Sequence, residues 1–237
     1  MPTERDNSID GNVKLYRQGG FFSALSAATQ ADFETLLVPV SHLGNKVLFS
    51  ETQPSNGVLV VIEGEVRLSI NSTDGRRLSL RIVGAGEVLG LSSTLSGNPY
   101  EMTADTLYPA KIAHIARQDF LNFLARHPEV YAVVTREVGR HYNLACEQLR
   151  MVGLSTSVPE RLACLLLRWS DSGHKTESAA ARCKLSLTHE EIGEFIGASR
   201  ETVTRTLSVF KNRRLVAQHG CTITIPSRVA LESYARG

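Results

Sequence analysis

Three charged residues that could read DNA bases, Arg200, Glu201 and Arg205, cluster near the start of a predicted helix over residues 200–213. Successive side chains on an α-helix are about 100° apart, so the three share one broad side. The apolar residues that would face a core lie on a different side: Val203, Leu207 and Phe210. A guanidinium group suits O6 and N7 of guanine, and a carboxylate accepts a hydrogen bond from cytosine N4. In isolation the pattern also fits a solvated face with local ion pairs, so the surrounding elements must decide.

The segment before this helix predicts a second, shorter helix and a tight turn. Thr188, followed three residues later by Glu191, is a capping box that starts the shorter helix. The turn over residues 197–199 begins with glycine and ends in Ser199, which caps the next helix. Two short helices joined by a glycine turn form a helix-turn-helix. The alternating run over residues 215–225 predicts a β-hairpin wing beside it, and together these elements favour base reading over a solvated face.

The N-terminal half has the pattern of a β-sheet domain. Short apolar runs predict strands at residues 58–62, 66–70, 78–82 and 111–115. Asp74-Gly75 separates two alternating runs, which is a strong hairpin pattern. Many short strands at this spacing predict an antiparallel sandwich or barrel. One or two short helices are predicted before it, over residues 21–38, with Ser26 or Thr29 as the cap.

A long helix is predicted from Pro128 to Val152, followed by a small polar hinge, a helix from Pro159 and a polar loop over residues 170–184. Seven residues of the long helix repeat at spacings of four and three, close to a coiled-coil heptad: Val130, Val134, Val138, His141, Ala145, Gln148 and Val152. We interpret this stripe as the seam of a homodimer, since polar residues such as His141 and Gln148 fix the register of such seams. The alternative is a helix that packs only against its own domain.

The distribution of charge favours an anionic partner. The formal net charge is +2, but residues 154–237 alone carry 12 Lys/Arg and 8 Asp/Glu, a net of +4. A basic C-terminal module is typical of nucleic-acid binding. No apolar run approaches the ~20 residues that span a bilayer. The polar residues 1–12 lack the apolar region of a signal peptide, so we expect a cytoplasmic protein with no membrane partner.

Motifs for catalysis or metal binding are missing from the sequence. It has no Gly-x-Ser-x-Gly, His-Glu-x-x-His or P-loop pattern. Its four cysteines are far apart and form no Cys-x-x-Cys pair, which argues against structural zinc or an Fe–S cluster: Cys146, Cys164, Cys183 and Cys221. We therefore predict that the protein is not an enzyme and holds no cofactor, and we interpret the cysteines as small hydrophobic residues.

The segment 187–205, with its core Ser199-Arg200-Glu201-Thr202-Val203-Thr204-Arg205, resembles the DNA-binding motif of the cyclic-AMP receptor protein/FNR (Crp/Fnr) family of bacterial transcription regulators. The resemblance extends over nearly the whole chain. It implies an α+β fold with an N-terminal double-stranded β-helix (jelly-roll) sensor of the cyclic-nucleotide-binding type, a long dimerisation helix and a C-terminal winged helix-turn-helix.

The same resemblance implies roles for individual residues. Arg200, Glu201 and Arg205 would read the bases of palindromic, TGTGA-like half-sites on double-stranded DNA. Four further residues match positions that contact phosphates: Thr188, Ser199, Thr202 and His219. Glu190 departs from the family, because the receptor has a neutral polar residue there. RNA polymerase is a further implied partner.

The sensor departs further from the members of the family that bind cyclic AMP. Those members carry Gly-Glu-Leu for the ribose and then Arg-Ser or Arg-Thr for the cyclic phosphate. This chain has Leu91 in place of the ribose carboxylate and Glu101 in place of the arginine, and no Arg lies between Leu91 and Thr106. We expect an effector other than cyclic AMP, in a pocket that includes Leu91, Ser92, Ser93, Glu101 and Thr103. The alternative is an empty sensor in a dimer that is always competent for DNA.

Other sensor chemistries of the family lack support in the sequence. The N-terminal cysteine cluster of the oxygen-sensing branch is absent. His42 and His114 could each ligate a haem, but a lone histidine in such a domain is usually structural or solvated, and we expect no haem.

We divide the chain into an arm over residues 1–12, a β-roll sensor over 13–127, a dimerisation helix over 128–153 and a winged helix-turn-helix domain over 154–237. A rival hypothesis is the cyclic-nucleotide-binding module of a kinase or channel. That module needs the phosphate arginine and has no recognition helix, whereas this chain lacks the arginine and has a predicted recognition helix. The leading hypothesis is a homodimeric, sequence-specific transcription regulator.

Overall fold

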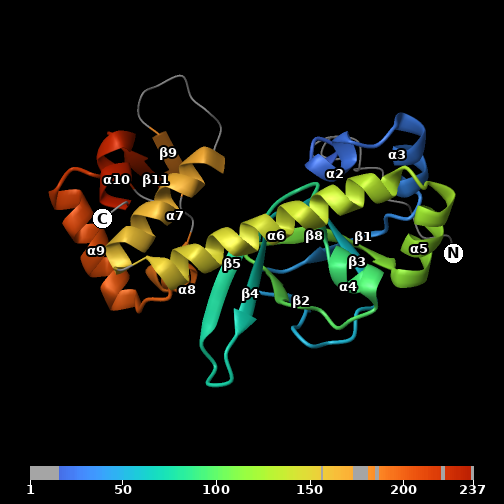
Figure 1. Ribbon diagram of the computed structural model, residues 1–237, viewed down its shortest axis with the longest axis horizontal. Coiled ribbons are helices and arrows are strands. Elements are labelled where there is room, and N and C mark those ends of the chain that lie inside the picture. The colour runs from blue at the N-terminus through green and yellow to red at the C-terminus, as the bar shows by residue number, and fades with distance from the viewer. Residues whose placement is uncertain (1–15, 156, 173–180, 185–186, 220–221, 236–237) are drawn as a thin grey trace, which may run out of the picture. The chain divides into compact units, whose positions relative to one another are not determined.

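The computed structural model describes residues 16–155, 157–172, 181–184, 187–219 and 222–235 (Figure 1), so the predicted arm over residues 1–12 lies outside them. The chain forms two compact units. The first comprises Met1–Arg76 with Leu80–Asn143, and the second comprises Arg77–Ser79 with Leu144–Gly237. The longest helix, α6 (Val130–Leu154), begins in the first unit and ends in the second. Among the described helices, none has both the length and the apolarity needed to cross a membrane.

Two short helices open the first unit, as the sequence predicts: α2 (Gly20–Ser23) and α3 (Ala27–Glu34). Ser26 is the cap of α3, because its hydroxyl accepts a hydrogen bond from the backbone N–H of Thr29 at 3.1 Å. Their aromatic side chains pack edge to face against one another and against α5 (Arg117–Arg126), for example Phe33 against Phe123 at 4.9 Å between ring centroids. The helices therefore form an apolar layer beside the sheets.

Two four-stranded antiparallel sheets form the predicted roll. One has the order β1-β8-β3-β6, from β1 (Pro39–His42), β8 (Ala110–Ala116), β3 (Gly57–Glu63) and β6 (Val88–Leu89). The other has the order β2-β7-β4-β5, from β2 (Val47–Phe49), β7 (Thr103–Thr106), β4 (Val66–Asn71) and β5 (Arg77–Val83). The short helix α4 (Leu91–Ser96) follows β6. The predicted turn at Asp74-Gly75 is present, with Gly75 at a φ of 82°.

Strand β3 is buried on both faces, which explains its continuous apolar run. Leu59 and Val61 belong to a core shared by the two sheets, together with Phe49 and Tyr100. Val58 and Val60 belong to a second core that the helices α2, α3, α5 and α6 complete. The sheet that contains β3 therefore has the inner apolar core on one face and the helical layer on the other.

The predicted dimer seam on α6 is wrong at three of its seven positions. Val130 and Val134 are fully buried in the core of their own unit. The Gln148 side chain is also buried, because its amide donates to the carbonyl of Phe195 at 2.8 Å and its Oε1 accepts from Arg168 at 2.7 Å. These three side chains already have partners in the same chain and are not available to a second copy.

The second unit contains the predicted helix-turn-helix and wing. Helix α7 (Val158–Ser172) precedes α8 (His189–Ile196) and α9 (Arg200–Asn212), and α10 (Arg228–Ala235) ends the unit. Its sheet has the order β10-β11-β9, from β10 (Ala217–His219), β11 (Thr222–Ile225) and β9 (Ala181–Lys184).

The predicted loop over residues 170–184 is wrong at both ends. Helix α7 continues to Ser172, and β9 pairs antiparallel with β11, with Cys183 opposite Ile223. Strand pairing between segments about forty residues apart leaves no local pattern in a short polar run. The hinge predicted over residues 153–157 is wrong at its start, because Gly153 and Leu154 are the last residues of α6. Its Thr156 lies outside the described residues, as do Gly220 and Cys221 of the wing.

Candidate nucleic-acid interface

Helix α8 starts at the predicted capping box. The backbone N–H of Glu191 donates to the Thr188 hydroxyl at 3.2 Å, and the Glu191 carboxylate accepts from the backbone N–H of Thr188 at 2.8 Å. Gly197 ends the helix in the left-handed conformation, with a φ of 61°. A Cβ on Gly193 would lie 2.3 Å from the carbonyl oxygen of Ala198. Only glycine lets the turn pass this close to α8, so this residue sets the geometry of the motif.

Helix α9 separates its core side from an exposed polar side, as predicted. Ser199 caps it by accepting a hydrogen bond from the backbone N–H of Thr202 at 3.3 Å. Its core side is fully buried: Val203, Leu207 and Phe210. Arg200, Glu201 and Arg205 are exposed on the other side. The three side chains that are predicted to read bases are therefore exposed to solvent, near the start of a capped helix.

The Glu201 carboxylate is held in its charged form. Its own backbone N–H at the helix N-terminus and the Ser199 hydroxyl lower the pKa of Glu201, and the neighbouring Arg200 guanidinium adds to the effect. The group is fully exposed, so its charge is available to an incoming partner. An ionised carboxylate is a hydrogen-bond acceptor only. At this position it can pair with a base amino group, such as N4 of cytosine.

Of the four predicted phosphate-contacting residues, three lie at the starts of α8 and α9 and the fourth lies on the wing. Thr188 and Ser199 act as helix caps, and the Thr202 hydroxyl lies 3.1 Å from that of Ser199. His219 is exposed at the end of β10, on the wing. Thr188, Ser199 and His219 are exposed, and Thr202 is half-buried. Each carries a hydrogen-bonding group that can contact a phosphate oxygen.

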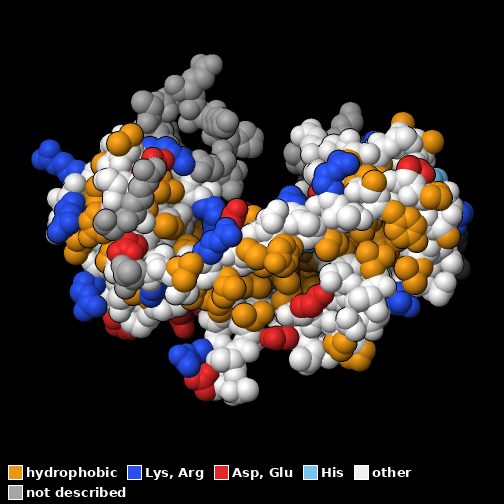
Figure 2. Space-filling view, in the orientation of Figure 1, with side chains coloured by type: hydrophobic (Ala, Val, Ile, Leu, Met, Phe, Trp, Pro, Cys, Tyr) orange, Lys and Arg blue, Asp and Glu red, His pale blue; other side chains and the backbone are white. Residues whose placement is uncertain are grey.

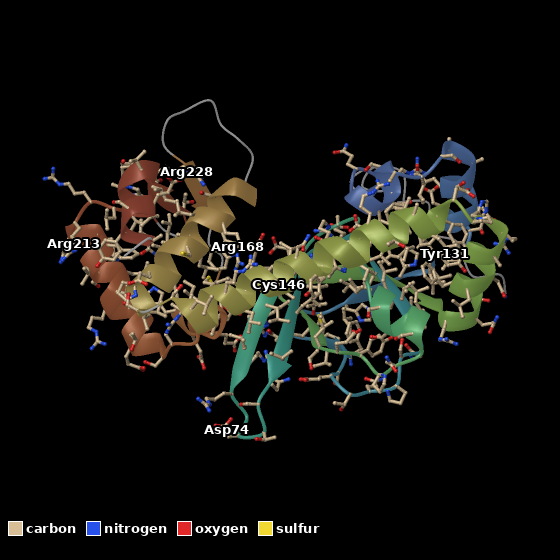
Figure 3. All side chains as sticks on the ribbon, viewed as in Figure 1. Asp74, Tyr131, Cys146, Arg168, Arg213 and Arg228 are labelled. Carbon is tan, nitrogen blue, oxygen red and sulfur yellow. The ribbon has the colours of Figure 1, made fainter. Side chains whose placement is uncertain are left out.

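Sequence reasoning missed further residues of this surface. His189, the first residue of α8, places Nδ1 2.7 Å from the Thr204 hydroxyl on the exposed side of α9. Lys211, Arg213 and Arg214 are exposed at the end of α9, where the Arg213 guanidinium lies over the Tyr234 ring at 5.6 Å (Figure 3). Figure 2 shows Lys and Arg side chains along the edge of the second unit that α9 occupies in Figure 1. The sequence signal for these residues is the basic run itself, which lies at the end of the predicted recognition helix.

The five predicted effector residues differ in their burial and in their hydrogen-bond partners. The Leu91 side chain is buried in the apolar core that the helices complete. Ser92 is exposed, whereas Ser93 is buried and donates to the exposed Glu101 carboxylate at 2.6 Å. Thr103 accepts a hydrogen bond from the backbone N–H of Glu51 at 3.1 Å. Among the five predicted effector residues, Ser93 and Glu101 are joined by a hydrogen bond.

Tyr100, which sequence reasoning did not place in the site, occupies the inner core next to these residues. Its ring stacks on Phe49 with 4.0 Å between centroids, and its hydroxyl donates to the carbonyl of Gly57 at 2.8 Å. A Cβ on Gly90 would lie 2.9 Å from the Tyr100 ring. Tyr100 therefore fills the space beside the Gly90 turn with a neutral side chain that is already hydrogen-bonded.

The two candidate haem ligands lie apart from any metal-binding arrangement. His114 is exposed on β8, with Nε2 3.2 Å from the Asn56 amide oxygen, and His42 ends β1. Within the described residues no three His, Cys, Asp or Glu side chains are grouped so that they could hold a metal ion.

Two family models match parts of the chain. Residues 39–127 match the cyclic nucleotide-binding domain, and residues 160–234 match the Crp-like helix-turn-helix domain. The chain is 27% identical over 94% of its length to a CRP-like cAMP-activated global transcriptional regulator of Mycobacterium tuberculosis, covering 99% of that protein. It is 29% identical over 81% of its length to the transcriptional activatory protein AadR of Rhodopseudomonas palustris, covering 79% of it.

A solved structure shares the fold. FixK2 from Bradyrhizobium japonicum aligns with a TM-score of 0.73 at 21% identity, over 84% of this chain and 96% of that one.

Proposed function

Since the chain belongs to the Crp/Fnr family of transcription regulators, we propose that it binds palindromic DNA as a homodimer and regulates transcription there. One observation carries this proposal: Arg200, Glu201 and Arg205 are exposed together on the first turns of the capped helix α9. The first turns of a recognition helix are the part that reaches base edges in the major groove. TGTGA-like half-sites about one helical turn apart fit these side chains.

We assign phosphate contacts to Thr188, Ser199 and Thr202 at the starts of α8 and α9, and to His219 on the wing. Such contacts set the position of the protein on the duplex without reading sequence. Selection of binding sites from random DNA tests the proposal. A palindrome with guanines at the predicted positions is expected, and recovery of unrelated sequences without symmetry would contradict it.

The homodimer is proposed to form through the exposed side of α6. Tyr131, which is labelled in Figure 3, is 47% exposed, and Tyr142 and Leu149 are 69% and 72% exposed. With residues between them they form a stripe at heptad spacing: Tyr131, Thr135, Val138, Tyr142, Ala145, Leu149 and Val152. This seam keeps Val138, Ala145 and Val152 of the seam predicted from sequence. The three buried residues, and His141, which lies near Glu87 and Glu137 of its own chain, are each replaced by the next residue along the helix. An apolar stripe of this kind on a long helix is typical of a surface that a second helix covers.

Sedimentation of a double variant tests this seam. Tyr142→Glu with Leu149→Glu places like charges in the stripe and should convert the dimer to monomer. Arg136→Glu is the control, because Arg136 is exposed on a different side of α6 and the substitution changes the net charge by the same amount. A double variant that remains dimeric would exclude this stripe as the interface.

The effector is proposed to differ from cyclic AMP, although the M. tuberculosis relative is described as cAMP-activated. Leu91 is in the core, Tyr100 fills the space beside the Gly90 turn, and Glu101 is the charged group nearby. A carboxylate repels a cyclic phosphate. Calorimetric titration with cyclic AMP and cyclic GMP should show no binding at micromolar concentration. Low-micromolar binding that raises operator affinity would overturn this part of the proposal.

A constitutive regulator is the second candidate, and the contacts of Tyr100 favour it. A sensor core closed by its own hydrogen-bonded side chain needs no ligand to complete it. RNA polymerase is proposed as the partner at promoters in either case. Operator affinity of the purified protein, with and without a metabolite extract, distinguishes the two: equal affinity supports constitutive binding, and a gain supports an effector.

A further inference from the structure

One hydrogen bond joins the start of α8 to the exposed side of α9. His189 Nδ1 lies 2.7 Å from the Thr204 hydroxyl oxygen, and that hydroxyl also donates to the carbonyl of Arg200 at 2.9 Å. Thr204 is exposed between Arg200 and Arg205 on α9. His189 therefore borders the side chains that are proposed to enter the groove, where a phosphate backbone would run.

The two contacts of Thr204 are the basis on which we assign the tautomer of the histidine. A threonine hydroxyl has one proton. Because that proton goes to the Arg200 carbonyl, as is usual for threonine in a helix, the Thr204 oxygen can only accept from His189. Nδ1 of His189 must then carry a hydrogen. In the neutral ring this leaves Nε2 with a lone pair and no proton, so it cannot donate to a phosphate oxygen.

Protonation reverses the character of Nε2. The imidazolium form has N–H donors on both nitrogens and a positive charge, and histidine changes charge between about pH 5 and 8. A phosphate oxygen next to Nε2 would accept its proton as a charge-assisted hydrogen bond. DNA would therefore bind the protonated form more tightly than the neutral one.

The charged residues nearest to His189 in sequence are Glu190 and Glu191 on α8. On α9, Thr204 lies next to Arg205 in sequence and donates to the carbonyl of Arg200. Helix α7 also packs against α8, but its Arg161 reaches the other end of α8, where it donates to the carbonyl of Ile196.

We propose that His189 is a protonation-dependent phosphate contact, so that each protomer takes up a proton when it binds DNA. The inference rests on the proposed DNA interface. Its consequence is that operator affinity increases as pH falls through the neutral range. The contact goes to the backbone, so the gain should be about equal for operator and random DNA.

Operator affinity between pH 8 and pH 6, at constant ionic strength, tests the proposal. The wild-type protein should bind about tenfold or more tightly at pH 6. His189→Asn keeps a donor for Thr204 but has no group at the Nε2 position, so it should bind weakly with little pH dependence. His189→Arg should bind tightly at both pH values. His219→Gln, which removes the other histidine of the interface, should retain most of the dependence on pH.

Thr204→Val tests the tautomer itself. Without the acceptor oxygen, the neutral ring can carry its proton on Nε2 and donate to phosphate, so affinity at pH 8 should rise towards the value at pH 6. A pH dependence that survives in His189→Asn, or that is absent in the wild type, would overturn the inference while leaving DNA binding intact. Failure to find any preferred operator at any pH would instead count against the proposed function.

Discussion

The two units of the chain use their polar side chains in opposite ways. In the second unit, the side chains on the outer face of α9 are exposed, and Arg200, Glu201 and Arg205 are presented to solvent by a capped helix. In the first unit, the polar side chains near the Gly90 turn bond to the protein itself, as Ser93 does to Glu101 and Tyr100 to Gly57.

The difference lies in whether the hydrogen-bonding side chains are exposed to solvent or already paired within the protein. Groups that are exposed near a helix N-terminus remain available to a partner such as DNA. Groups that are buried and paired stabilise the fold, and removing one leaves its partner unsatisfied. The described residues of the roll follow the second pattern closely, because Ser69 Oγ is the one buried side-chain polar atom found there without a hydrogen-bond partner.

The buried ion pair of the roll gives the largest expected effect. The Arg67 guanidinium donates to the Asp105 carboxylate at 2.7 Å, and both side chains are at most 6% exposed. Asp105→Ala leaves a buried charge without this partner, and we expect a loss of about 3–5 kcal/mol in the free energy of unfolding. Chemical denaturation measures it.

The exposed pair between Arg76 and Asp74 is the matched control. Its two side chains are 84% and 57% exposed, so Arg76→Ala should cost about 0–1 kcal/mol. Similar losses in the free energy of unfolding for Asp105→Ala and Arg76→Ala would show that burial does not determine how much each ion pair contributes to stability.

His141 predicts a pH dependence of stability in the first unit. Burial, then the nearby Arg81 and Arg140, lowers the pKa of His141 to about 4. The unfolded chain takes up a proton at this residue below pH ~6.5, whereas the folded chain stays neutral. This group should therefore lower the free energy of unfolding by about 2 kcal/mol between pH 7 and pH 5.

Denaturation of wild type and His141→Gln at both pH values isolates this contribution. The variant should lose less stability on acidification than the wild type. Parallel losses would mean that His141 is already charged in the folded protein.

Gly193→Ala should damage the second unit through its backbone. The added Cβ would meet the Ala198 carbonyl oxygen at 2.3 Å, so the turn between α8 and α9 must move. We expect a cost of about 1–3 kcal/mol in stability together with weaker operator binding. Glu190→Ala, at an exposed position of the same helix, should change stability by less than about 0.5 kcal/mol. Equal free energies of unfolding for the two variants would mean that the turn can accept a Cβ at Gly193 without moving.

Much of the fold could be predicted from local patterns. The capping box at Thr188, the Ser199 cap and the Asp74-Gly75 hairpin each depend on residues a few positions apart, and all three are present. Strand β9 could not be predicted, because its pairing with β11 joins distant segments. The register of the α6 seam also required the structure, since Val130 and Tyr131 lie only about 100° apart on the helix, yet one is buried and the other exposed.

The sensor shows the same limit. Sequence alone indicates that Leu91 and Glu101 replace the groups that bind a cyclic nucleotide. It does not show that Leu91 lies in the core or that Tyr100 stacks on Phe49, because both contacts depend on how separate strands and turns pack.

The central claim is that the exposed face of α9 reads DNA sequence, and Arg200→Ala tests it most directly. Affinity for the selected operator and for random DNA should be measured side by side, with Thr202→Ala as the comparison. Arg200→Ala should cost about 1–3 kcal/mol on the operator, relax the preference at one guanine and change random binding much less. Thr202→Ala should weaken both DNAs about equally. Equal losses on operator and random DNA for Arg200→Ala would contradict the claim that this helix reads bases.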